Sequence, residues 1–215
     1  ASGNASITAN QIDNGSSDAC GILSMGVSPS SFSCANVGAN AVTLTVTDVN
    51  GNISVCSATV TVQDLVAPVA ICQDITVPLN MSGNATITAA QINNGSNDAC
   101  GIQFVIVSPN AFTCANVGAN VVTLTVTDVN GNVSTCAATV TITTVYGCTN
   151  PLAVNFDPAA ICNDGSCSFD GCAYPLADNY NPLALVDDGS CLFSGCTDPT
   201  ASNYCETANN DDGSC

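Results

Sequence analysis

Long stretches of the chain alternate apolar residues with Thr or Ser. "AVTLTVTD" at 41–48 and "VVTLTVTD" at 121–128 have a period of two, the pattern of a half-buried β-strand. "ISVCSATVTV" at 53–62 and "VSTCAATVTI" at 133–142 follow the sequence "DVNGN", whose Asn-Gly pair favours a tight hairpin. Further strands are predicted at 70–79, 85–92 and 102–108. Because no helical period is present, the pattern predicts an all-β protein.

Internal repeats organise the whole chain. The segment 2–22 returns at 82–102 and the segment 34–62 returns at 114–142, in both cases with an offset of 80 residues. A shorter period of 24 residues begins at Cys148, with each unit opened and closed by a cysteine. We therefore predict a first β module at 1–65, a second at 66–145, and a region at 146–215 made of three short repeats (147–170, 171–194 and 195–215).

The two long modules have the strand content of a β-sandwich. About seven short strands in each complete module are typical of an immunoglobulin-like fold. The predicted fold is thus a tandem of immunoglobulin-like β-sandwiches, the first lacking its first strand, followed by small, disulfide-stapled, loop-rich repeats.

Two strings of residues also carry a resemblance to known families. The order Cys–"DITV"–"DACGI"–"CANVGANVVTLTVTDVNGN"–"TCAATVTI" is similar to HYR-type repeats, an immunoglobulin-like module of extracellular and bacterial surface proteins. The "GCTDPTASNY…DDGSC" units resemble short tandem repeats found in secreted and cell-surface proteins of Bacteroidota. Both resemblances imply an architecture and an extracellular or cell-surface location rather than an activity.

The charge balance excludes several classes of function. The chain has no Lys, Arg or His but 17 acidic residues, a formal net charge of −17. Nucleic acid and anionic membranes are therefore excluded as natural partners. The usual general bases and nucleophile activators are missing, and there is no Trp to line a sugar cleft. We expect no enzymatic activity, and we expect divalent cations to balance the charge.

The 15 cysteines recur at repeated spacings and predict a disulfide framework made in an oxidising compartment. Zinc is disfavoured because no Cys-x2-Cys pair occurs. Proximity in sequence pairs Cys100 with Cys114, and the corresponding Cys20 and Cys34 are also expected in disulfides. Closing each short repeat would stabilise it by about 3 kcal/mol, through Cys148–Cys167, Cys172–Cys191 and Cys196–Cys215. The HYR resemblance implies Cys72–Cys136. Cys56, Cys162 and Cys205 stay open, and one alternative pairs Cys162 with Cys205.

The first module poses a question of completeness. Residue 1 aligns with residue 81, so the first module has no counterpart of 66–80 and no partner for Cys56. Two explanations are open: the chain is a window from a longer repeating polypeptide, which we favour, or a neighbouring subunit supplies the strand. Neither a signal peptide nor an apolar run of 18 residues is present, so we expect a mature, exported segment without a membrane span.

Acidic turns suggest calcium. The last 70 residues hold ten of the 17 acidic groups, and calcium takes about six to eight oxygen ligands with tolerant geometry. The alternative is that Asp-Gly only forms a turn. In "DVNGN", where Asp48, Asn50 and Asn52 alternate, a hairpin turn is favoured. Asp64, at a Pro-containing junction, is weakly indicated for interdomain calcium. The candidate ligands in the short repeats are Asn155, Asp157, Asp164, Asn179, Asp187, Asp188, Asn203, Asp211 and Asp212.

Seven Asn-x-Ser/Thr sequons are candidates for covalent glycans, although strands rich in Asn, Ser and Thr also produce sequons by chance. They are Asn4, Asn14, Asn52, Asn80, Asn84, Asn94 and Asn132.

These observations favour a structural role. The leading hypothesis is a segment of an extracellular filament, fibre or surface stalk, stapled by disulfides, stabilised by calcium and in contact with copies of itself. The alternative is an adhesin or carbohydrate-binding spacer of a larger secreted protein, with glycans or a cell surface as partner. Tyr174, Tyr180 and Tyr204 are the aromatic candidates for such binding. Tyr180 and Tyr204 share a position with Phe156, which favours packing instead.

Overall fold

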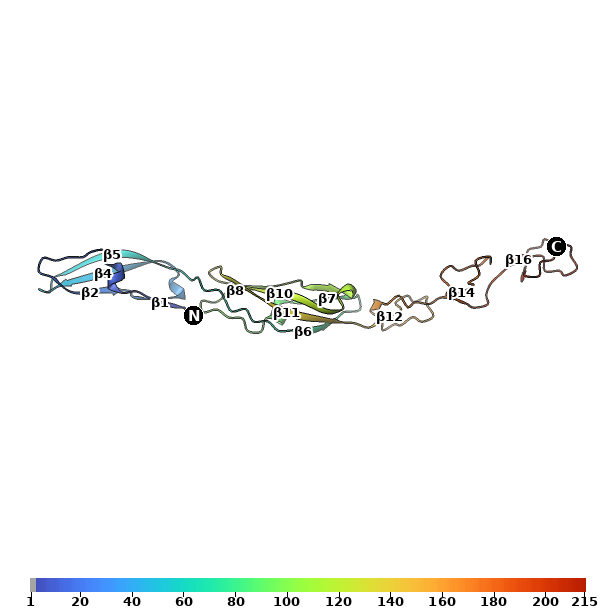
Figure 1. Ribbon diagram of the computed structural model, residues 1–215, viewed down its shortest axis with the longest axis horizontal. Coiled ribbons are helices and arrows are strands. Elements are labelled where there is room, and N and C mark those ends of the chain that lie inside the picture. The colour runs from blue at the N-terminus through green and yellow to red at the C-terminus, as the bar shows by residue number, and fades with distance from the viewer. Residues whose placement is uncertain (1–2) are drawn as a thin grey trace. The chain divides into compact units, whose positions relative to one another are not determined.

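The computed structural model describes residues 3–215 (Figure 1). β-Strands dominate in this range, and the two α-helices found among the described residues, α1 (Ala9–Ile12) and α2 (Ala89–Ile92), have four residues each. The structure is therefore all-β and rich in disulfides, as the sequence predicts. Within the described residues, no helix has the length and apolar character needed to cross a membrane.

The chain divides into two compact units. The first contains the residues up to 75 together with 87–110 and 121–139, and the second contains 76–86, 111–120 and 140–215. The elements are described below in the order of the sequence repeats.

The first module is built on a three-stranded antiparallel sheet. Its strands β2 (Ile22–Ser28), β4 (Gly38–Asp48) and β5 (Ile53–Val62) lie in the order β2-β4-β5. A small ribbon pairs β1 (Asn4–Ser6) with β3 (Ser31–Ser33), and a 3-10 turn, η1 (Cys34–Asn36), follows. The "DVNGN" hairpin joins β4 to β5, and Asp48 caps it because its Oδ1 accepts the backbone N–H groups of Asn50 and Asn52, both at 2.8 Å.

The second module repeats this plan and adds one strand. β8 (Ile102–Ser108), β10 (Gly118–Asp128) and β11 (Val133–Thr143) match β2, β4 and β5. The added strand β6 (Ile75–Pro78) lies at the edge of the sheet, whose order is β6-β11-β10-β8. β7 (Asn84–Thr86) pairs with β9 (Ala111–Thr113), which η2 (Cys114–Asn116) follows. The buried apolar side chains of the second module are Leu79, Ala85, Ile87, Ile92, Phe112, Val122, Leu124, Val126, Ala138, Val140 and Ile142.

Two of the predicted strands are shorter than expected. The prediction of a strand at 85–92 is wrong beyond Thr86, because Ala89–Ile92 forms α2. A capping box explains the change: Gln91 Oε1 accepts the Thr88 backbone N–H at 2.8 Å and so begins the helix. Of the predicted strand at 70–79, only Ile75–Pro78 is continuous, and Val69 and Cys72 form isolated bridges to Asn97 and Asn93.

Each short repeat contains one two-residue parallel pairing. These are β12 (Tyr146–Gly147) with β13 (Cys162–Asn163), β14 (Asp170–Gly171) with β15 (Val186–Asp187), and β16 (Ser194–Gly195) with β17 (Asn210–Asp211). The middle repeat buries only Cys172, Ala177 and Cys191, with Phe193 packed against them. Such small cores need covalent staples.

Candidate metal centre

The described residues contain six disulfides, and four of them are the expected ones. Cys72–Cys136 ties the segment before β6 to β11. The short repeats are closed by Cys148–Cys167, Cys172–Cys191 and Cys196–Cys215, each with a sequence separation of 19. The "DDGSC" turns therefore end on a disulfide, as the repeat spacing predicts.

The expected pairing of Cys100 with Cys114 is wrong. Cys100 bonds Cys34 of the first module, and Cys114 bonds Cys162 of the first short repeat. The extended strand β8 separates Cys100 from Cys114, and a disulfide needs Cα atoms about 4.4–6.8 Å apart. Sequence proximity is therefore a poor guide across an extended strand.

This arrangement also corrects two related expectations. Cys34 is taken by Cys100, so Cys20 is an exposed free thiol rather than a disulfide partner of Cys34. Cys162 does not pair with Cys205, which is free and exposed, as is Cys56. The repeat offset of 80 carried a signal for the true pattern, because Cys34 and Cys114 are equivalent and each bonds a cysteine of the next repeat.

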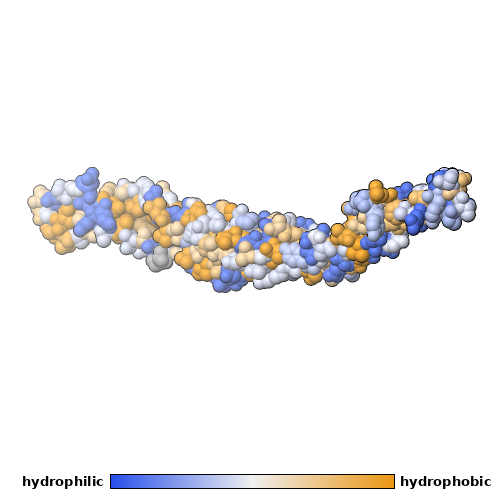
Figure 2. Space-filling model, turned by 45° about the vertical axis from the view of Figure 1, so that its right-hand side comes forward, coloured by the Kyte–Doolittle hydropathy of each residue, from blue (hydrophilic) through white to orange (hydrophobic). Residues whose placement is uncertain are grey.

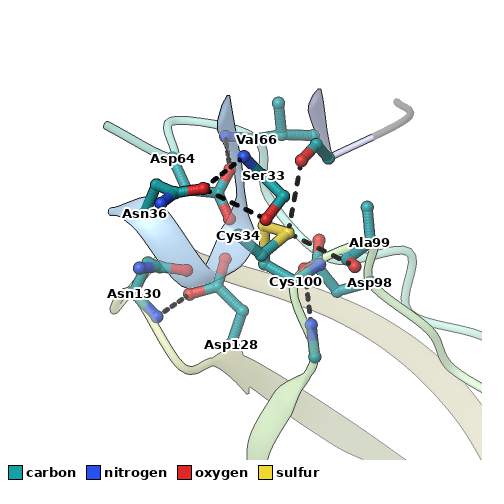
Figure 3. Close-up of a disulfide and its surroundings, with 12 residues drawn as sticks. Ser33, Cys34, Asn36, Asp64, Val66, Asp98, Ala99, Cys100, Asp128 and Asn130 are labelled. Carbon is teal, nitrogen blue, oxygen red and sulfur yellow. Dashed lines mark hydrogen bonds between the residues drawn. A yellow bond between two sulfur atoms is a disulfide. The ribbon is translucent and has the colours of Figure 1, made fainter. Parts of the chain in front are cut away.

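Beside the Cys34–Cys100 disulfide, two carboxylates approach each other (Figure 3). The ligand atoms of Asp64 and Asp98 lie within 4.8 Å of one another and of the Cys100 sulfur. That sulfur belongs to a disulfide, so only the carboxylates are able to bind a metal. Asp98 Oδ1 accepts the N–H groups of Cys100 at 2.7 Å and Gly101 at 3.1 Å.

Asp64 has one oxygen without a partner. Its Oδ1 accepts the Val66 N–H at 3.1 Å, whereas its Oδ2 is buried and has no hydrogen-bond partner among the described residues. Leaving a buried carboxylate oxygen unpaired is costly. Since the chain contains no Lys, Arg or His, no side chain of this protein can supply the missing positive charge.

Asp128 lies close to these residues in the same view (Figure 3). It is fully buried, with 0% of its surface exposed, and its Oδ2 accepts the Asn132 Nδ2–H at 2.8 Å. Burial works to raise the pKa of Asp128, but hydrogen bonds from Asn132, Asn130 and Gly131 outweigh burial and lower the pKa below its ordinary value. Asp128 is therefore held as a carboxylate, and it adds negative charge to the junction.

The donor set fits a hard divalent cation such as Ca²⁺. Calcium binds carboxylate oxygens together with backbone carbonyls and water, and it accepts irregular geometry. Asp64 Oδ2 is the orphaned buried oxygen that such an ion would satisfy. The Asn132 side chain also bridges the junction, because its Nδ2–H donates to the Asp64 carbonyl oxygen at 3.1 Å. Only Asp64 was indicated from the sequence, because the approach of Asp98 depends on the tertiary fold.

The candidate ligands of the short repeats make hydrogen bonds within their own repeats. The three equivalent Asn residues bind the chain itself: Asn155 Nδ2–H donates to the Ser166 carbonyl oxygen, and Asn179 and Asn203 repeat this bond to Ser190 and Ser214, all at 2.7 Å. Asp157 Oδ1 accepts the Ala159 N–H at 2.9 Å, and Asp211 Oδ1 accepts the Gly213 N–H at 3.1 Å. Asp187 Oδ1 lies 3.3 Å from the Cys191 sulfur. Calcium at these turns stays a prediction.

The remaining aspartates of these turns cap them. Asp164, Asp188 and Asp212 each accept the backbone N–H of the serine two residues later, at 2.8–2.9 Å. Hydrogen bonds from the side chain and backbone of that serine lower the pKa of each of these aspartates. The geometry matches the turn-forming alternative.

The sequons and aromatic residues have simple placements. Six of the seven sequon asparagines are exposed, whereas Asn132 is partly buried and its Nδ2–H donates to both Asp64 and Asp128. Tyr174 packs edge-on against Phe193, with ring centroids 6.3 Å apart. Phe156, Tyr180 and Tyr204 are partly exposed, at 41%, 40% and 45%.

No family model matches this chain, and no curated protein matches it.

Proposed function

We propose that this chain is a structural segment of an extracellular filament, fibre or surface stalk, and not an enzyme. The observation that carries the proposal is the pair of disulfides Cys34–Cys100 and Cys114–Cys162, which join each β module to the repeat that follows it in the sequence. Such a disulfide joins two repeats instead of closing a loop inside one repeat. Its direct effect is to limit how far successive repeats separate under load.

The proposal includes an immunoglobulin-like sandwich for each β module and an extracellular or cell-surface location. Supporting the fold, each module combines an antiparallel sheet with a small two-stranded antiparallel ribbon. Supporting the location, six disulfides in one chain are typical of an oxidising compartment.

We further propose that Ca²⁺ binds at Asp64, Asp98 and Asp128. The ion would satisfy the buried Asp64 Oδ2 and offset three negative charges at the junction. It would hold residues at the end of the first module against the loops of the second. Calcium would thus add stiffness where the Cys34–Cys100 disulfide adds a covalent limit.

Electron microscopy of the purified protein tests the structural role. We expect regular filaments in calcium-containing buffer, and shorter or disordered ones after treatment with a chelator and a thiol reductant. Isolated particles under all conditions, together with binding to a glycan array, would overturn the proposal in favour of an adhesin or carbohydrate-binding spacer. Isolated particles without glycan binding would overturn it as well.

A further inference from the structure

The two β modules place nearly identical side chains in two different environments. In the second module, residues 64–79 cover one face: β6 pairs with β11, and Cys72 bonds Cys136. The first module has no such segment among the described residues, and the equivalent Cys56 is a free, exposed thiol on β5. The second module therefore shows what the open face of the first module is shaped to hold.

Burial differs accordingly at equivalent positions. Ile92, Val126, Asp128 and Val140 are each 0% exposed in the second module. Their counterparts in the first module are only partly buried, although every one is the same residue: Ile12, Val46, Asp48 and Val60. On β5, Ile53 and Val55 are both 66% exposed, and Figure 2 shows hydrophobic surface over this module.

Residues 64–79 are called the linker below. A groove lies on the first module at the place where the linker lies on the second module. It encloses about 400 Å³ and is lined by residues that include Ser16, Ser17, Asp18, Ser54 and Cys56. In the second module, the counterparts of four of these residues contact the linker directly. Val69 bridges Asn97, the Ile71 N–H donates to Ser96 Oγ at 2.9 Å, Ser134 Oγ–H donates to the Pro68 carbonyl oxygen, and Cys136 bonds Cys72.

Most groups that bind the linker are present in the first module. In the second module, the Gln73 N–H donates to the Ile92 carbonyl oxygen, and the Asn94 N–H donates to the Ile71 carbonyl oxygen, both at 2.9 Å. Asn132 Nδ2–H donates to the Asp64 carbonyl oxygen at 3.1 Å. The first module offers the same residues at Ile12, Asn14 and Asn52.

We propose that the open face of the first module binds an extended segment of the same type as residues 64–79, and that a cysteine in this segment forms a disulfide with Cys56. The partner carries a cysteine at the position of Cys72 and apolar residues at the positions of Ile75, Val77 and Leu79. The inference rests on the proposed structural role and names the partner for it.

The covalent step is an oxidation. The thiols of Cys56 and of the incoming cysteine lose two protons and two electrons and form one S–S bond. A disulfide oxidant of the glutathione class accepts them and is reduced to two thiols. Cys20 is the counterpart of Cys100 and, like Cys56, is a free thiol. The same contact therefore places a second cysteine of the first module near the partner.

A synthetic peptide of residues 64–81, DLVAPVAICQDITVPLNM, tests the proposal on the full chain. Its cysteine is activated as a 2-pyridyl disulfide, so that attack by the Cys56 thiolate forms the S–S bond and releases 2-thiopyridone without another oxidant. The control peptide carries Val77→Asp and Leu79→Asp, which leave the reactive cysteine unchanged but remove the apolar anchors. Peptide mapping then locates the bond among Cys20, Cys56 and Cys205.

We expect the native peptide to label Cys56 at least tenfold faster than the control peptide does, and faster than it labels Cys20 or Cys205. Equal rates for the two peptides, or equal labelling of the three thiols, would overturn the proposal. A non-covalent readout accompanies it: with Cys56→Ser in the protein and Cys72→Ser in the peptide, β5 amides should still gain protection from hydrogen exchange. Peptide capture does not require a filament. Capture can therefore fail while filaments form, and capture can succeed while no filaments form, so that the two proposals fail separately.

Discussion

Asp98 and Asp18 are one residue type in one kind of turn but in two environments. Each accepts the N–H groups of the cysteine and glycine that follow it, at 2.7 and 3.1 Å. Only Asp98 has Asp64 within 4.8 Å. Asp18 therefore serves only its turn, whereas Asp98 serves its turn and also lies in the proposed cation site.

The proposed calcium site therefore predicts unequal effects of two matched substitutions. Calcium at 100 times its dissociation constant stabilises a protein by about 2.7 kcal/mol, so the wild-type melting temperature should rise by several degrees. Asp98→Asn should abolish this rise, because it removes a carboxylate while its side-chain oxygen still accepts the turn bonds. Asp18→Asn should keep the rise. Thermal melts with and without EDTA provide the measurement, and an equal calcium response in both variants would contradict the site.

Gly83 makes room for a disulfide between repeats. Its φ is +72°, and a Cβ placed there would lie 3.2 Å from Cys114 Sγ. Gly83→Ala should therefore destabilise the fold by about 1–2 kcal/mol from the backbone alone and should also hinder Cys114–Cys162. Gly95→Ala is the control, because Gly95 has a φ of +86° but no atom within 4 Å of such a Cβ. Thiol counting should find free Cys114 and Cys162 only in the Gly83 variant, and equal counts would refute the steric role.

Acid should weaken the turns. Hydrogen bonds hold the pKa of Asp48, Asp164, Asp188 and Asp212 below the ordinary 3.8. Groups with a depressed folded pKa contribute stability that is present above the unfolded pKa and lost as the pH falls through the folded pKa. Stability should therefore drop below about pH 4. Protonation also reduces the repulsion among the carboxylates, which would stabilise the fold and oppose this effect. Denaturant titrations should therefore be made in about 1 M salt, where the Debye length is near 3 Å and the repulsion is screened. Unchanged stability down to pH 2 would contradict the assignment.

Among the elements, strands β4 and β10 share the sequence "VTLTVTD" yet differ in support. β10 lies beside β11, which β6 and the Cys72–Cys136 disulfide cover, whereas β5 in the first module has a free edge. The stability of a strand depends on what packs on its neighbours, and not only on its own propensity.

Hydrogen exchange measures this difference within one molecule. Amides of β10 should exchange at least 100 times more slowly than those of β4, because opening β10 requires the covered sheet to open as well. The repeated sequence cancels differences in intrinsic exchange rate. Equal protection in the two strands would mean that residues 64–79 contribute nothing to the stability of the second module.

The sequence predicts the strands with a strong alternating pattern and the staples that lie inside one repeat. β5 and β8 match the predicted ranges, and Cys72–Cys136 matches the resemblance. The strand pattern fails where a local signal competes with it, as at α2, where the Thr88–Gln91 capping box begins a helix. The sequence also fails for contacts between repeats, because Cys34–Cys100 and the Asp64–Asp98 approach depend on how distant segments meet.

At the scale of the whole molecule, the disulfides form a connected series. Force applied between the two ends passes through Cys34–Cys100 and Cys114–Cys162, then through Cys172–Cys191 and Cys196–Cys215, and bypasses the residues inside those loops. The central claim is that these bonds limit extension.

Single-molecule force spectroscopy tests that claim most directly. At about 3.3–3.6 Å per extended residue, the oxidised chain should unfold to about a third of the length that it reaches after reduction. Replacing Cys34 and Cys100 together by Ser should lengthen the oxidised chain by roughly 100 Å, because force then takes the longer route through Cys72–Cys136 and Cys148–Cys167. Replacing the free Cys205 by Ser should change nothing. An oxidised chain that extends as far as the reduced one would contradict the account.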